Sequence, residues 1–473
     1  MAADKYQMDM CHGPLFRKIL IFALPLIVTY VLQLLFNAID LVVIGHYASH
    51  EAMAAVGATM NINALFINVF IGLSIGANVL VSRYFGAGDR DRMRSTVHTA
   101  MTVALEGGVL LMIAGLLAAK PLLVLMKTPE EILPGACLYC RICFAAIPFL
   151  MLYNFGCAVL RAVGDTRRPL LFLIFAGLVN VLLNLFFVIV CRMDVGGVAL
   201  ATAVSHGISA LLIAAALLRA KGAYRLDWRR LRVDWGIFRE MLGIGIPAGM
   251  QSSCFAVSNM LIQSSINSFG ALAMAGTTAS LGLEGIVYVG SFALHQTAIS
   301  FVAQNYGGRQ YRRILKSIWL CMATGTAICT TGALTVYLLG DFFLGIYTPD
   351  QEVIAWGLRR MKVVFLGYGL CGVMDTVSGS LRGLGYSLLS AVNTVFGVCV
   401  FRVWWVLVMF PRCRTMEYLM MSYPISWGLV ALINGTVLYF VCRRTLLRKR
   451  PPPVWRFLKP MLPRGFRFLG GSK

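Results

Sequence analysis

Charged residues are scarce in this sequence. They make up 13% of its 473 residues, whereas soluble domains carry roughly 25%. Hydrophobic residues make up 59%, which leaves too little polar surface to cover a molecule in water. The composition therefore excludes an ordinary soluble protein and favours one that lies within a membrane.

Motifs of nucleotide-driven and hydrolytic chemistry are also missing. The sequence has no G-x-x-x-x-G-K-[ST] phosphate loop, no H-E-x-x-H and no G-x-S-x-G. Of its 13 cysteines, Cys137, Cys140 and Cys143 form the closest group, without a second Cys/His pair at zinc-like spacing. We interpret the cysteines as small core residues and expect neither an enzyme nor a cofactor.

Long apolar stretches account for most of the chain. A membrane-spanning helix needs about 20 largely apolar residues, and the stretches are continuous, unlike the alternating segments of a β-barrel. The first stretch follows a segment with both acids and bases and leads directly into further stretches, so it is not a cleaved signal peptide. We predict an all-α integral membrane protein with twelve transmembrane helices at about residues 19–44, 56–81, 95–119, 136–160, 169–191, 196–218, 240–266, 272–303, 314–339, 356–381, 387–410 and 417–441.

Positive charge is distributed unevenly between the two sides. The net charge is +22, and most of the 42 Lys and Arg residues, such as Arg83, Arg229 and Arg313, fall on the side of the N-terminus. Basic loops favour the cytoplasmic side. We therefore predict a multi-pass protein of the bacterial cytoplasmic (inner) membrane with both termini in the cytoplasm. Anionic lipid headgroups, rather than nucleic acid, are the expected partner of the basic loops and tail.

The two halves of the chain repeat each other. The segment "FRKILIFALPLIVTYVLQ" from Phe16 matches "FREMLGIGIPAGMQSSCF" from Phe238, and the same alignment pairs Gly86 with Gly307. Each half holds an even number of spans, so the repeats are parallel, as in transporters that rock around a central cavity. We predict two pseudo-symmetric six-helix lobes at 1–220 and 237–441, joined by a basic amphipathic cytoplasmic linker at 221–236 and followed by a basic cytoplasmic tail at 442–473.

The first span contains polar residues that lipid disfavours. A charge at the bilayer centre costs about 2.5–3.5 kcal/mol, so an embedded acid is a functional candidate. Gln33, Asn37 and Asp40 share one helix face. Pro25 in the same helix removes a backbone hydrogen bond and favours a bend.

Asp40 has companions on two other spans. Asn184 and Thr202 are expected at a similar depth, roughly 6–10 Å from the outer ends of their helices, with Asn180 one turn deeper. A carboxylate, two amides and a hydroxyl suit a proton or a hard cation such as Na⁺. The alternative is that the amides only join helices by hydrogen bonds.

The second half has acids of its own. Glu284 and Asp375 are expected near mid-membrane, with Asp375 opposite Asn154 in the repeat. Either acid could bind a second ion or attract a cationic substrate, and structural pairing of one of them with Arg402 is the alternative. The sequence assigns no role to Glu106, and His206 and His295 are interpreted as packing residues.

Taken together, these residues resemble the multidrug and toxic compound extrusion (MATE) family, nearest its DinF-like bacterial branch. The likeness extends over about residues 14–441 and rests on "LPLIVTYVLQLLFNAIDLVVIG", "RYFGAGDRDRM", "LRAVGDTRRP", "NVLLN", "GGVALATAVS" and "AQNYGGRQYRR". The resemblance implies twelve helices in two lobes. It also implies export of mostly amphipathic organic cations, driven by inward flow of H⁺ or Na⁺.

The resemblance also implies roles for particular residues. Asp40 matches the aspartate of the family's cation site in the first lobe, and Pro25 matches the proline at which that helix bends. Asn180, Asn184 and Thr202 match the other members of that site, although some DinF-like members have an aspartate at the position of Asn184. The acidic positions of NorM-like members in the second lobe correspond to Phe255 and Cys371 here, which favours the first-lobe site.

The sequence therefore predicts a monomeric antiporter that exports amphipathic, cationic organic compounds in exchange for H⁺ or Na⁺. The alternative is a flippase or a dedicated exporter of a lipid-linked or metabolite precursor. The sequence names neither the substrate nor the coupling ion.

Overall fold

The computed structural model describes residues 6–47, 50–126 and 128–448, and within these ranges the chain forms helices and no strands. The predicted tail at 442–473 lies outside these ranges from residue 449 onward. The helices are α1 (Leu15–Tyr47), α2 (His50–Ala87), α3 (Arg90–Leu125), α4 (Leu133–Ala162), α5 (Arg167–Leu185), α6 (Asp194–Leu218), α7 (Trp235–Asn267), α8 (Ala271–Gly307), α9 (Tyr311–Leu338), α10 (Gly340–Gly345), α11 (Gln351–Val364), α12 (Tyr368–Gly383), α13 (Ser387–Thr394), α14 (Phe401–Trp404), α15 (Met416–Met420) and α16 (Ser422–Arg448). Three π-helical segments accompany them: Phe186–Val190 continues α5, and Val395–Val400 and Trp405–Met409 flank α14.

The twelve-helix prediction is confirmed. In the described residues, ten helices are long and apolar enough to span a membrane, and the pair α11–α12, bent by 51°, makes an eleventh. The remaining predicted stretch, 240–266, forms α7, whose apolar run is interrupted by residues such as Gln251, Ser252 and Asn259. A spanning helix with this many polar residues needs a protein or water-filled environment on one face.

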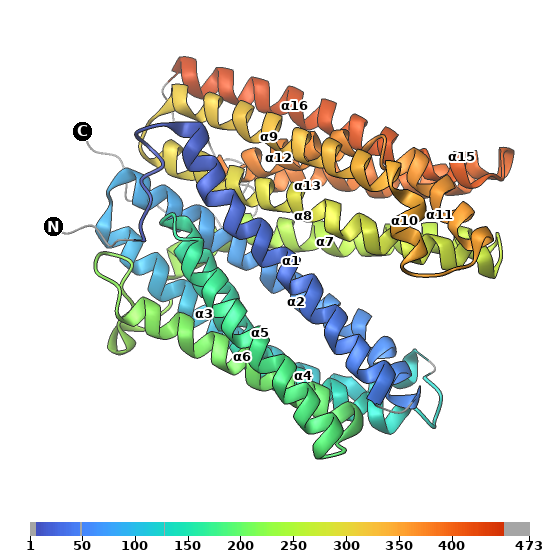
Figure 1. Cartoon of the computed structure of the whole chain (residues 1–473). Coiled ribbons are helices and arrows are strands. Elements are labelled where there is room, and N and C mark those ends of the chain that lie inside the picture. The colour runs from blue at the N-terminus through green and yellow to red at the C-terminus, as the bar shows by residue number, and fades with distance from the viewer. Residues whose placement is uncertain (1–5, 48–49, 127, 449–473) are drawn as a thin grey trace, which may run out of the picture.

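The helices form two groups, which we call the first lobe (α1–α6) and the second lobe (α7–α16). Figure 1 shows the lobes close together where α1 and α7 begin and diverging toward the other end. We call the first of these the basic end, because it holds Arg83, Arg92 and Arg313, and the second the far end. The main contact between lobes is made by α2, which packs against α7 and α8.

Glycines allow this contact between lobes to be unusually close. A Cβ atom on Gly86 would lie 1.9 Å from the carbonyl oxygen of Gln304, and one on Gly307 would lie 1.9 Å from that of Arg83. Farther along α2, a Cβ on Gly72 would lie 2.5 Å from the backbone of Gly245. Because Gly86 and Gly307 are paired in the sequence repeat, each lobe contributes one glycine to the same crossing. No side chain fits between the two backbones.

The N-terminal segment crosses the closed basic end. Met8 donates its backbone N–H to the carbonyl of Val163 in the first lobe, at 3.1 Å. Two residues later, Met10 donates its N–H to Gln304 Oε1 in the second lobe, at 2.6 Å, and its carbonyl accepts from Arg313 Nε at 2.8 Å. The segment therefore bonds to both lobes in the closed arrangement.

The linker between the lobes is anchored to the first one. Tyr224 and Leu226 are buried in the core of that lobe, and only Trp228–Arg230 form a short 3₁₀ turn. His98 Nε2 accepts from the N–H of Asp227, and Thr99 Oγ1 accepts from that of Asp234. This attachment fixes the start of α7 relative to α3.

The glycine contact can be tested by adding one methyl group. Gly86→Ala places a Cβ against the backbone of Gln304, and overpacking costs about 1–3 kcal/mol. The basic end should therefore open more often, by roughly fivefold or more. Cys11 is 7% exposed beneath this contact and donates to the carbonyl of Gln304, so its rate of alkylation should rise by that factor.

Peptide mass spectrometry separates Cys11 from the exposed Cys191 and Cys413. Gly207→Ala is the matched control, because a Cβ there meets nothing within 4 Å. Equal Cys11 labelling in the two variants would show that the glycine contact does not hold the basic end closed.

Candidate functional site

Four polar residues of the first lobe form one hydrogen-bonded chain across three helices. Asn184 on α5 donates from Nδ2 to Asp40 Oδ1 on α1 and, at 3.3 Å, to Asn180 Oδ1. Asn180 in turn donates to Thr202 Oγ1 on α6, at 3.5 Å. The residues predicted to share a depth therefore lie in contact, and we call them the Asp40 group.

The Asp40 group has unused capacity for a positive species. Asp40 makes no ion pair with any residue that the structure describes, and Asn184 Oδ1 is buried without a donor in that same part of the chain. A carboxylate beside an orphan carbonyl oxygen suits a proton or a hard cation. The π-helical segment Phe186–Val190 begins two residues after Asn184, and such segments are frequent at functional sites.

The other polar residues predicted near this site lie apart from it. Asn37 is exposed and Gln33 is half-buried, and neither hydrogen-bonds to the Asp40 group. Asn154 donates to the carbonyl of Leu150 in its own helix, at 3.0 Å. Glu106 lies on the surface of α3. Pro25 lies within the continuous helix α1, and its carbonyl accepts from Thr29 Oγ1 at 2.7 Å.

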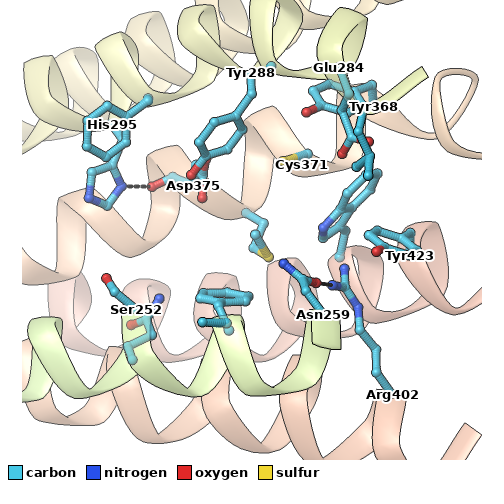
Figure 2. A pocket seen from close by; sticks show the side chains of 18 of the residues that line it. Ser252, Asn259, Glu284, Tyr288, His295, Tyr368, Cys371, Asp375, Arg402 and Tyr423 are labelled. Atoms are coloured by element: carbon cyan, nitrogen blue, oxygen red, sulfur yellow. Dashed lines mark hydrogen bonds between the residues drawn. The ribbon is translucent and has the colours of Figure 1, made fainter. Parts of the chain in front are cut away.

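The second lobe holds a cavity of about 540 Å³, within the size range of small-molecule sites. One end of the cavity lies next to the close contact between the lobes. There it is lined by Asn68, one turn from Gly72 on α2. Gln251 and Ser252, which follow Gly249 on α7, line it as well. Figure 2 shows side chains from α7, α8, α12, α14 and α16 pointing into it. The cavity is therefore bounded on its basic side by backbone packed against backbone.

Both acids predicted in the second half line this cavity, but their partners differ. Asp375 Oδ2 accepts from Ser291 Oγ at 2.8 Å, and the backbone carbonyl of Asp375 accepts from His295 Nδ1 at 2.7 Å. Glu284 forms an ion pair with Arg360, whose side chain is only 1% exposed. The predicted alternative of an ion pair with Arg402 is wrong, because Glu284 on α8 pairs with Arg360 on α11.

Sequence reasoning did not identify the polar face of α7. Gln251, Phe255 and Asn259 recur at four-residue spacing, which places them on one face of the helix, and all three line the cavity. The signal was present in the sequence as an unusually polar span. Arg382, Arg402, Tyr423 and Trp427 also line the cavity, and no local motif marks them.

The arrangement suits binding and release of an organic molecule. Aromatic rings of Tyr288, Phe292 and Trp427 supply apolar walls, and amides, hydroxyls and charges supply orientation. Among the described residues, no group of three His, Cys, Asp or Glu side chains could hold a metal ion.

Comparisons with known proteins agree with this architecture. A sequence model of the MatE family matches residues 25–186 and 247–406. The chain is 28% identical over 396 residues to the probable multidrug resistance protein YpnP of Bacillus subtilis, covering 83% of this chain and 88% of that protein. It is 23% identical over 452 residues to a FAD transporter of Shewanella oneidensis, covering 92% and 96% of the two chains. Its fold is similar to the outward-facing conformation of a multidrug resistance MATE family transporter, with a TM-score of 0.88, 19% identity and coverage of 95% and 100%.

Removing the charge of Glu284 should lower the stability of the protein more than removing an exposed charge, because its partner Arg360 is buried. Glu284→Gln leaves Arg360 buried without its counter-charge, and breaking a buried pair costs about 3–5 kcal/mol. Thermal unfolding in detergent should therefore occur at a clearly lower temperature. Glu106→Gln is the matched control, because it makes the same change at an exposed carboxylate on α3.

The double variant Glu284→Gln with Arg360→Met removes both charges and should recover most of the lost stability. If Glu284→Gln and Glu106→Gln lower the melting temperature equally, Glu284 has no special structural role.

Proposed function

Because the chain belongs to the MatE family of membrane transporters, we propose that it exports amphipathic organic compounds in exchange for H⁺ or Na⁺. Members of this family are transporters and not enzymes. The observation that supports the proposal is the pairing of an acid–amide group in one lobe with a large polar and aromatic cavity in the other. The lobes meet at the basic end and diverge at the far end (Figure 1).

In the proposed cycle the far end faces the outside of the cell. Asp40 binds a proton or Na⁺ that enters from outside, with Asn180, Asn184 and Thr202 as the polar surroundings of the ion. Neutralising Asp40 weakens its attraction for Asn184 and changes how α1 packs between Pro25 and its far end. Substrate leaves the cavity to the outside, the contact at the basic end opens, and the ion is released into the cytoplasm.

Asp375 is the residue of the cavity that favours a cationic group on the transported compound. Its carboxylate lines the cavity and accepts from the neutral Ser291. An ammonium group near this carboxylate would gain attraction in a site partly shielded from water.

A dedicated metabolite exporter is the second candidate. The similarity to a FAD transporter extends over almost the whole of both chains. The cavity also contains arginines, which a transporter specialised for organic cations does not need.

The coupling step is tested with Asp40→Asn in proteoliposomes. A tenfold ion gradient stores about 1.4 kcal/mol, which at one-for-one exchange supports roughly a tenfold gradient of a fluorescent organic cation. The wild type should build a gradient of this order when a pH or Na⁺ gradient is imposed separately, and the effective gradient identifies the ion. Asp40→Asn should build none, while still equilibrating the compound across the membrane.

Glu106→Gln is the control, since it removes a carboxylate from the surface of α3 rather than from the Asp40 group. Gradient-driven accumulation by Asp40→Asn at the wild-type level would refute the assignment of the ion site.

A further inference from the structure

The charges buried around the second-lobe cavity do not balance. Three arginines lie there, with exposed fractions of 1% for Arg360, 5% for Arg382 and 3% for Arg402. The acids that line the cavity are Glu284 and Asp375. Since Glu284 pairs with Arg360, Asp375 is left to offset two arginines. One positive charge has no negative counterpart among the described residues, and an uncompensated buried charge is costly.

Arg402 lines the cavity and is positioned there by three neutral side chains. Its Nε donates to Ser426 Oγ at 3.1 Å and its Nη1 donates to Asn259 Oδ1 at 3.3 Å. The guanidinium carbon lies 4.0 Å from the centre of the Tyr423 ring, a cation–π contact. All of these partners are neutral, so they position the guanidinium without neutralising it.

Two hydrogen-bond donor groups at Arg402 and Asn259 remain unused. Nη2 of Arg402 and the amide nitrogen of Asn259 have no hydrogen-bond acceptor in the part of the chain that the structure describes. Figure 2 shows Asn259 and Arg402 facing each other at the wall of the cavity. Planar guanidinium groups match the oxygens of carboxylates and phosphates, to which they can donate two bonds at once.

Arg382 is likewise held by neutral groups. Its Nη2 donates to Gln251 Oε1 at 2.7 Å, and its Nη1 lies 3.4 Å from His295 Nε2. Because Nδ1 of His295 faces a carbonyl oxygen that can only accept, Nδ1 bears the hydrogen and Nε2 accepts from Arg382. Arg382 therefore adds a second positive potential to the same cavity.

From this geometry we infer that the second-lobe cavity binds an anionic group, a carboxylate or a phosphate, at Arg402 and Asn259. The inference rests on the proposed function only in identifying this anion as part of the transported compound. The rings of Trp427, Tyr288 and Phe292 line the same cavity and provide surfaces for a flat aromatic part. The ligand class is thus an aromatic compound with an anionic substituent.

Binding to the full chain in nanodiscs of zwitterionic lipid tests the inference, with calorimetry as the measurement. The probes are 1-naphthyl phosphate, 1-naphthylmethylammonium and 1-naphthalenemethanol, which share one ring system and differ in charge. A hydrogen bond to a charged group contributes about 1.5–3 kcal/mol, so the phosphate should bind at least roughly tenfold more tightly than the ammonium. Tighter binding of the ammonium would overturn the inference, and this comparison needs no variant.

The variant Arg402→Gln tests whether the anionic group binds at Arg402. It should weaken binding of the phosphate by about tenfold to a hundredfold and leave binding of the neutral alcohol unchanged. Arg402→Lys should restore part of the affinity, because it retains the charge and loses the planar fork. Arg312→Gln removes an exposed arginine of the same charge and is the matched control. Equal affinity for the phosphate in Arg402→Gln and Arg312→Gln would overturn the assignment to Arg402.

The source of the anion is resolved by adding an anionic lipid. If phosphatidylglycerol in the nanodisc displaces the naphthyl phosphate, the anionic group belongs to a lipid headgroup, and if it does not, it belongs to a soluble compound. The measurement is at equilibrium without an ion gradient, so it is independent of Asp40. If the wild type does not bind the phosphate but accumulates substrate under an ion gradient, only this inference is overturned. If it binds the phosphate but does not accumulate substrate, only the coupling mechanism is overturned.

Discussion

The close contact of α2 with α7 and α8 is the constraint on which the rest of the structure depends. Backbone meets backbone at Gly72, Gly86 and Gly307, where even a methyl group would overlap neighbouring atoms. Interfaces of small residues are how membrane helices gain dispersion energy without a hydrophobic driving force. Because this contact occupies only the basic half of α2, the lobes are free to diverge beyond it, and the cavity begins within one turn of its end.

The two lobes repeat each other in sequence but use their interiors differently. The first lobe places one acid among amides and a hydroxyl, a group of four residues suited to an ion. The second places two acids and three arginines around a cavity large enough for an organic molecule. Both sites adjoin π-helical segments, Phe186–Val190 beside Asn184 and two segments around Arg402. The two repeats thus share one frame, and their different polar residues separate the proposed ion site in the first lobe from the proposed substrate cavity in the second.

The fold and the Asp40 group could be predicted because their signals are local. Continuous apolar runs define the helices, and Asp40, Asn180 and Asn184 stand out as polar residues in such runs. The partner of Glu284 could not be predicted, since Arg360 lies beside Arg359 and Lys362 at the start of the predicted span 356–381 and nothing in the sequence distinguishes it from them. The N-terminal segment was also missed, because its backbone N–H groups bond to the carbonyl of Val163 and the side chain of Gln304, which are far away in the sequence. Long-range pairing of common residue types leaves no pattern along the chain.

Helix α1 is the element through which the two sites can influence each other. It carries Asp40 near its far end, and on the side of the second lobe its Tyr30 packs edge-on against Phe292, with ring centres 4.9 Å apart. Phe292 lines the cavity and stacks on His295, the residue that binds both Asp375 and Arg382. A chain of contacts is only a route, and coupling also requires an element with two arrangements. Pro25 makes α1 the candidate for that element, because a helix that lacks one backbone hydrogen bond can change its bend at low cost. Ion binding at Asp40 would then act on the cavity by moving Tyr30. It would not need a direct electrostatic interaction between the ion and the cavity across the space between the lobes.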